Sequence, residues 1–163
     1  QRHGSRRSQP TLHLEWQPIE EVIGASIQVA SQSLRANAVR VALSPDLPLV
    51  AIDAVLMERV LCNLLENAAK FSPPGAEITI SADVEDDRLA LSVNDRGCGF
   101  PPGSLPRVFD LFERGATESP VAGVGLGLAI CRAIVESHGG TVRVDPEHAP
   151  GARLEVVLPA VGP

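Results

Sequence analysis

The stretch Val60-Leu-Cys-Asn63-Leu-Leu-Glu-Asn67-Ala-Ala-Lys70-Phe71 is the most informative part of this 163-residue chain. It predicts the second half of an amphipathic helix that starts after Asp53, a good N-cap residue, and ends before Pro73-Pro74-Gly75. An α-helix turns by about 100° per residue, so Asn63, Asn67 and Lys70 fall together at the edge of one apolar arc. The arc should pack on a sheet; its members are Met57, Val60, Leu61, Leu64, Leu65 and Ala68.

Two asparagines one turn apart are unusual inside a helix, because the Asn amide competes for backbone hydrogen bonds. An amide oxygen is a neutral, hard ligand that suits a Mg²⁺ ion already shared with phosphate oxygens. Lys70 could place a positive charge near the same phosphates. In the alternative interpretation, Asn63 and Asn67 cap neighbouring loops and Lys70 is solvated.

Two glycine motifs follow in the chain. Asp95-x-Gly97-x-Gly99 comes after an apolar strand, where a carboxylate can accept the exocyclic N–H of adenine and would repel guanine. Gly123-Val-Gly125-Leu-Gly127-Leu128 leads into a helix expected over residues 126–138, whose free N–H groups suit a phosphate. Taken singly, the motifs also fit an Asp-Gly turn and a tight packing turn. Their order matches one pocket for a magnesium-bound adenine nucleotide.

The remaining pattern alternates strands and helices. We expect a helix over 19–35, a short helix near 105–112 within a loop over 96–124, and strands over 12–16, 39–43, 49–52, 77–84, 89–94, 141–144 and 153–158. A turn at 85–87 joins the central hairpin, and Gly139-Gly140 ends the last helix. The fold class is therefore α+β: a two-layer sandwich with a mixed, mostly antiparallel sheet of about five or more strands packed on three helices. Residues 1–10 read as a linker, 11–160 as one domain and 161–163 as a tail.

Bulk properties exclude several classes. A net charge of −6 argues against a nucleic-acid surface, which needs a basic patch. The three cysteines form no C-x-x-C pair, so neither a disulfide framework nor a zinc knuckle is indicated. No apolar run approaches the roughly 20 residues that a membrane-spanning helix needs.

Together, the motifs resemble the catalytic ATP-binding domain of sensor histidine kinases, in the superfamily that includes gyrase, Hsp90 and MutL. Asn63–Lys70 resembles the N box, Asp95–Gly99 the G1 box, Phe109–Arg114 the F box and Gly123–Leu128 the G2 box. The similarity covers about Leu12–Pro159 and implies a Bergerat-type ATP-binding fold. More narrowly, the chain is similar to the KdpD-type potassium sensor kinases.

The resemblance implies ATP and Mg²⁺ as cofactors and gives each motif a role. Asn67 would bind the metal, Asn63 would make a second polar contact at the phosphates, and Asp95 would bind adenine. The other implied positions are Lys70 and Arg114 for phosphate, Gly97 and Gly99 for the base pocket, Phe109 and Phe112 as lid anchors, and Gly123, Gly125, Gly127 and Leu128 for closure of the lid over the phosphates.

One departure from the superfamily concerns hydrolysis. Its ATPases carry a water-activating Glu four residues before the metal-binding Asn, and here that position is Asn63. Glu66 lies about 100° away on the helix. No evident general base remains, which suits a histidine protein kinase that keeps ATP intact for another acceptor.

The implied partners are the protein's own dimerisation and phosphoacceptor helical domain and a KdpE-like response regulator, with no nucleic acid. None of His3, His13, His138 and His148 lies in an acceptor box, so this chain alone should not autophosphorylate. The isolated domain should be monomeric, and the full-length protein a homodimer with this domain on the cytoplasmic side of an inner membrane. The alternatives are a gyrase- or Hsp90-type hydrolase, a non-catalytic nucleotide-sensing module and a Ser/Thr anti-sigma kinase.

Overall fold

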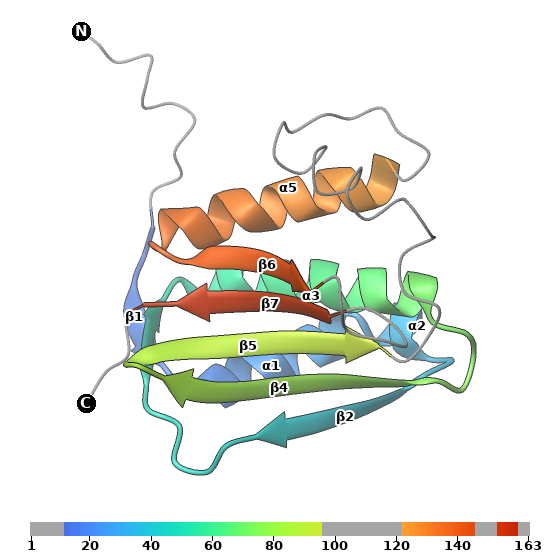
Figure 1. Cartoon of the computed structure of the whole chain (residues 1–163), viewed down its shortest axis with the longest axis horizontal. Coiled ribbons are helices and arrows are strands. Elements are labelled where there is room, and N and C mark those ends of the chain that lie inside the picture. The colour runs from blue at the N-terminus through green and yellow to red at the C-terminus, as the bar shows by residue number, and fades with distance from the viewer. Residues whose placement is uncertain (1–11, 96–121, 146–152, 160–163) are drawn as a thin grey trace, which may run out of the picture.

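The computed structural model describes residues 12–95, 122–145 and 153–159 (Figure 1). A five-stranded sheet has the order β2-β4-β5-β7-β6. Its strands are β2 (Ala38–Leu43), β4 (Glu77–Glu85), β5 (Arg88–Asp95), β6 (Thr141–Asp145) and β7 (Arg153–Leu158). β2 is parallel to β4, whereas the other neighbours are antiparallel. The predicted mixed, mostly antiparallel sheet is therefore confirmed.

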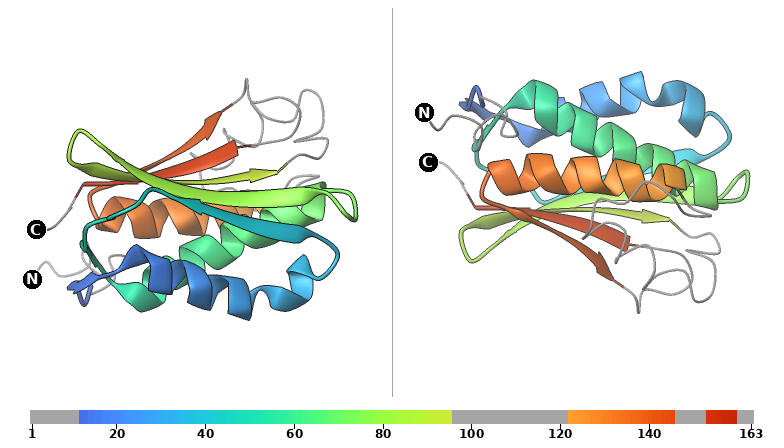
Figure 2. Two further views of the ribbon diagram at one scale, coloured as in Figure 1. Left: turned by 90° about the horizontal axis from the view of Figure 1, so that it is seen from below. Right: turned by 90° about the horizontal axis from the view of Figure 1, so that it is seen from above.

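All the described helices cover one face of this sheet (Figure 2). They are α1 (Ile19–Val29), α2 (Ser31–Leu34), α3 (Ala54–Phe71) and α5 (Ala122–Ser137). Alternate strand residues point toward them because side chains alternate between the two faces of a sheet. The predicted apolar arc of α3 is buried in this core, and its most exposed member, Ala68, is only 6% exposed. The two-layer architecture is confirmed.

A second, two-stranded sheet closes the end of the helix layer at which α3 begins and α5 ends (Figure 1). Its strands are β1 (Glu15–Gln17) and β3 (Val50–Ile52), which pair antiparallel. β3 leads directly into Asp53, whose side chain accepts a hydrogen bond from Leu56 N at 3.2 Å and caps α3 as expected.

Two helix predictions were wrong in their extent. The helix expected over 19–35 is split at Ala30, where the backbone leaves helical geometry with φ −88° and ψ 8°. The turn buries both Ala30 and Leu34 while Val29 stays exposed, so core packing decides the break. The last helix begins at Ala122 rather than 126, so Gly123 and Gly125 lie inside its first turns and not in a preceding loop. Burial of Leu128 and Cys131 along this helix offsets the helix cost of glycine, about 1 kcal/mol per residue.

Other boundaries moved by a few residues. The central hairpin turns through Asp86 and Asp87, both at positive φ, so its loop is two residues long rather than three. Gly139 ends α5 at φ +79°, as its position after the helix predicts. The predicted linker over 1–10, the tail over 161–163 and the short helix near 105–112 lie outside the described residues. No described helix is both long and apolar enough to cross a membrane.

Candidate functional site

Three segments that carry the sequence motifs reach the same end of the molecule. The last turns of α3, the end of β5 and the first turns of α5 lie together at the right in Figure 1 and in the right-hand view of Figure 2. Residues far apart in sequence therefore share one region. Gly97, Gly99, Phe109, Phe112 and Arg114 lie outside the described residues.

The polar side chains at the edge of the apolar arc of α3 differ in their exposure. Asn67 is 9% exposed, Asn63 is half-buried, and Lys70 and Glu66 are exposed. The two amides therefore sit at the boundary between the core and the surface, while the Lys70 ammonium can reach a ligand from solvent. Glu66 faces away from the core, as the helical spacing predicts.

Two buried polar atoms without a hydrogen-bond partner lie near the end of α3. Among the described residues, the buried side-chain atoms without a partner are Asn67 Nδ2, Ser72 Oγ and Asn94 Oδ1. Ser72 is the C-cap residue of α3. Asn94 is next to Asp95 on β5, but its side chain lies on the opposite, open face of the sheet, because side chains alternate along a strand. An unpaired buried polar atom costs about 1–3 kcal/mol, so buried polar atoms in proteins are nearly always paired. The unpaired atom of Asn67 is an N–H donor, so it fits an external acceptor such as a phosphate oxygen.

Ser72 was not among the residues predicted from the sequence. The only local signal was its position just after the N-box segment, since Ser72 follows Phe71. The burial of its hydroxyl depends on packing between elements, which spacing along one chain segment does not reveal.

Asp95 is a buried carboxylate at the end of a strand. It is 3% exposed, is the last residue of β5 and pairs in register with Ile78 of β4. An ionised carboxylate only accepts hydrogen bonds, so this position can recognise an N–H donor such as an exocyclic amine. Burial makes such recognition specific, because an acceptor opposite this carboxylate would be repelled.

Near the start of α5, Gly127 has free space around it, whereas its neighbour Leu128 is packed in the core. A Cβ atom added to Gly127 would meet nothing within 4 Å, whereas Leu128 is fully buried in the core. One turn further on, the Cys131 thiol donates to Val60 O at 3.6 Å. Helices α3 and α5 are thus joined by a polar contact close to the predicted amides.

The described residues do not build a metal site of the His, Cys or carboxylate type. No group of three or more His, Cys, Asp and Glu side chains gathers within those residues. Within the described residues, the side chain at the α3 end that suits a cation such as Mg²⁺ is the Asn67 amide.

At the opposite end of the helix layer, Asp53 and His138 form hydrogen bonds within the protein. The Asp53 N–H donates to His138 Nε2 at 3.1 Å, and His138 Nδ1 donates to Ile134 O at 2.8 Å. Burial raises the pKa of the Asp53 carboxyl, but the N–H groups of His13 and Leu56 more than offset this and hold it below its ordinary value. His138 therefore has a structural role and carries its proton on Nδ1.

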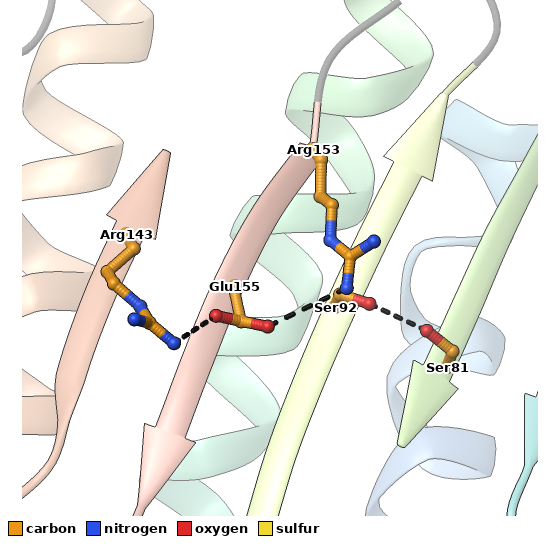
Figure 3. Close-up of polar contacts among 5 residues, drawn as sticks. All are labelled: Ser81, Ser92, Arg143, Arg153 and Glu155. Carbon is orange, nitrogen blue, oxygen red and sulfur yellow. Dashed lines mark hydrogen bonds and ion pairs between the residues drawn. The ribbon is translucent and has the colours of Figure 1, made fainter. Parts of the chain in front are cut away.

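The open face of the sheet carries a polar network. Arg143 and Arg153 both form ion pairs with Glu155, and the pair between Arg153 and Glu155 spans 3.6 Å (Figure 3). On the neighbouring strands, Ser81 Oγ lies 2.6 Å from Ser92 Oγ. Beside it is a cavity of about 260 Å³, lined by Glu85, Asp86, Arg88, Ala90, Thr141, Arg143 and Val157. Arg88 and Asp95 lie at opposite ends of β5, roughly 24 Å apart. This cavity is therefore separate from the α3 end.

A family described as "Histidine kinase-, DNA gyrase B-, and HSP90-like ATPase" matches residues 52–162. The chain belongs to this family. It is an ATP-binding catalytic domain of the sensor histidine kinase type, and its match begins at β3 and includes every element that carries a motif.

Relatives of this ATPase domain include sensor kinases. The sensor protein KdpD of Escherichia coli is 48% identical over 148 residues, which are 91% of this chain and 16% of that protein. The sensor protein KdpD of Clostridium acetobutylicum is 36% identical over 143 residues, 86% of this chain and 16% of that protein. The chain thus spans about a sixth of the length of these relatives.

Solved structures show the same fold. The mycobacterial sensor histidine kinase MprB aligns with a TM-score of 0.74 and 30% identity, covering 94% of this chain and all of the other. Full-length ShkA, solved in complex with AMPPNP, aligns with a TM-score of 0.79 and 27% identity over 94% of this chain and 32% of ShkA.

Proposed function

We propose that this ATPase domain holds Mg·ATP and donates the γ-phosphoryl group to a histidine on a separate dimerisation domain, in potassium or turgor signalling. The observation that carries the proposal is the buried Asn67 side chain, whose amide N–H donor has no partner among the described residues and can meet a phosphate oxygen of the nucleotide. It lies at the end where the buried Asp95 carboxylate and the first turns of α5 also lie.

Each residue has a distinct task in this proposal. Asp95 accepts the exocyclic N–H of adenine, and Asn67 holds the cation through its amide oxygen. Lys70 places a positive charge at the phosphates from the surface, and Asn63 adds a polar contact there. Bound Mg²⁺ would neutralise charge on the phosphate oxygens. The proposed binding set also includes the remaining motif residues, which are Gly97, Gly99, Phe109, Phe112, Arg114, Gly123, Gly125, Gly127 and Leu128.

The described part of the site favours transfer over hydrolysis. Asn63 occupies the position of the water-activating Glu in the superfamily's ATPases, and Glu66 is exposed on another side of α3. Because neither Asn63 nor the exposed Glu66 is placed to activate water, bound ATP would survive until an acceptor arrives. The proposed partners are the protein's own helical dimerisation domain, in a homodimer on the cytoplasmic side of an inner membrane, and a KdpE-like response regulator. The KdpD relatives support the signalling context.

Calorimetric titration with Mg·ATP and Mg·GTP tests nucleotide selection. Wild type should bind Mg·ATP at least about tenfold more tightly than Mg·GTP, because a lost or repelled buried hydrogen bond to a charged group costs about 1.5–3 kcal/mol. Asp95→Asn should lose that preference, while the exposed Asp83→Asn on β4 should keep it. Equal binding of both nucleotides by wild type would contradict the proposed role of Asp95.

Labelled ATP tests the proposed reaction. With a separately produced dimerisation domain from the same protein, the label should appear on that domain and not on this chain. Sustained phosphate release in the absence of an acceptor would instead favour a hydrolase of the gyrase or Hsp90 type.

A further inference from the structure

Ser72 carries a buried hydroxyl group at the end of α3. It is the C-cap residue of this helix, and its backbone is extended there, with φ −105° and ψ 137°. Its Oγ atom is buried and has no hydrogen-bond partner among the described residues, although the residue as a whole is only half-buried. A buried hydroxyl without a partner has lost its bonds to water and gained none in the protein, which lowers the stability of the unliganded fold.

Two other helical serines show how such a hydroxyl is usually satisfied. Ser26 Oγ in α1 donates to Val22 O at 2.7 Å, and Ser137 Oγ at the end of α5 donates to Ala133 O at 2.9 Å. Both bonds reach back four residues along the helix, which is a common arrangement for serine. The extended backbone of Ser72 has left helical geometry, and its hydroxyl makes no such bond to the preceding turn.

The turn between α3 and β4 is otherwise held by hydrogen bonds. Asn37 Nδ2 donates to Pro73 O at 3.0 Å and to Ala76 O at 2.8 Å. The N–H of Gly75 donates to Ala36 O at 2.7 Å. These bonds fix the turn on the residues that precede β2. The unpaired hydroxyl at the start of this turn therefore does not come from a loosely held segment.

We propose that Ser72 is a further nucleotide-binding residue, whose hydroxyl hydrogen-bonds to a polar atom of the ligand at the α3 end. The proposal rests on the proposed nucleotide-binding function and adds one contact to that site. Ser72 lies two residues after Lys70 and about 7.5 Å beyond Asn67 along the helix axis, so one extended ligand can contact all three. A hydroxyl both donates and accepts hydrogen bonds, so it can bind an oxygen or a nitrogen of the nucleotide.

Calorimetric titration with Mg·ATP and thermal unfolding of Ser72→Ala together test the proposal. The variant should bind Mg·ATP about 3- to 10-fold more weakly than wild type, the size of one ordinary hydrogen bond. Without ligand, its melting temperature should stay the same or rise by about 2–4 °C, because an unpaired buried hydroxyl is removed. Loss of affinity without loss of stability is not expected of a residue that only supports the fold.

The matched control is Ser26→Ala, which removes a buried hydroxyl that is bonded within the protein. Its melting temperature should fall by about 2–4 °C, and its affinity for Mg·ATP should equal that of wild type.

The outcomes separate this contact from the proposed function. If wild type binds Mg·ATP and Ser72→Ala binds it equally well, the contact is overturned and the proposed function stands. A melting temperature that falls in Ser72→Ala as it does in Ser26→Ala would also overturn the contact, because the hydroxyl would then have a partner in the unliganded protein. If wild type does not bind Mg·ATP at all, the proposed function fails and the contact fails with it.

Discussion

The two ends of α3 differ in whether their described polar groups have hydrogen-bond partners within the protein. At the first end, Asp53 accepts bonds from His13 N and Leu56 N and donates to His138. At the last end, Asn67 and Ser72 bury polar atoms that have no partner among the described residues. At the first end the protein itself supplies the hydrogen-bond partners, as in a structural contact. At the second end a ligand could supply them, as in a binding site.

This contrast has an energetic consequence. Satisfied buried groups stabilise the fold, whereas an unpaired one lowers stability by about 1–3 kcal/mol. A fold retains such groups where another interaction offsets the cost. Substitutions at the first end should therefore change stability alone, and those at the second should change nucleotide affinity with little loss of stability.

The largest expected effect is on stability, from Gly140→Ala beside the first end. An added Cβ would lie 2.2 Å from Val157 O and 3.1 Å from Val135 Cγ1, so β7 or α5 must shift. The free energy of unfolding in urea should fall by about 3 kcal/mol. Gly24→Ala is the control, because a Cβ there meets nothing within 4 Å. Similar stabilities for the two variants would show that the close contact is not rigid.

Asn67→Ala should separate affinity from stability at the second end. Mg·ATP affinity should fall about tenfold or more, the cost of one good ligand contact, as measured by calorimetry. The free energy of unfolding should stay the same or rise by about 1 kcal/mol, because an unpaired buried amide is removed. Glu66→Ala, one residue earlier and exposed, should change neither quantity. A large loss of stability without loss of affinity would reverse the contrast between the two ends.

Asp53→Ala should destabilise the first end in a pH-dependent way. Loss of the helix cap should cost about 1 kcal/mol at neutral pH and leave Mg·ATP affinity unchanged. The folded pKa of Asp53 lies below its ordinary value of 3.8, so its stabilisation is complete above that value and is lost as pH falls through the folded pKa. Urea unfolding of both proteins between pH 7 and about pH 3 should show the difference shrinking only below about pH 4. A constant difference over that range would contradict the role of the charged carboxylate.

The smallest expected effect comes from Gly127→Ala, near the start of α5. A methyl group there meets nothing within 4 Å, so unfolding free energy should rise by up to about 1 kcal/mol through better helix propensity. If the glycine serves closure over the phosphates, Mg·ATP affinity should nevertheless fall by about threefold, or roughly 0.6 kcal/mol. Gly24→Ala in α1 again serves as the control, with unchanged affinity. Unchanged affinity in Gly127→Ala would remove this glycine from the binding set.

Local chemistry made much of this fold predictable from the sequence. The cap at Asp53, the apolar arc of α3, the Gly139 helix end and the strand over 153–158 all depend on residues that are neighbours in the chain. The order of the motifs likewise indicated the family, because it requires no knowledge of distances.

Only the tertiary structure decided which polar groups are satisfied. The break at Ala30 follows from burying Leu34, and the start of α5 at Ala122 follows from packing that overrides the cost of glycine. The bond between Asp53 and His138 spans 85 positions of the chain, and the contact of Cys131 with α3 spans 71. Periodicity and capping act over a few residues, whereas these contacts depend on how distant segments pack. The sequence by itself therefore determined the elements and the family, and the packed structure determined which of their polar atoms are left for a ligand.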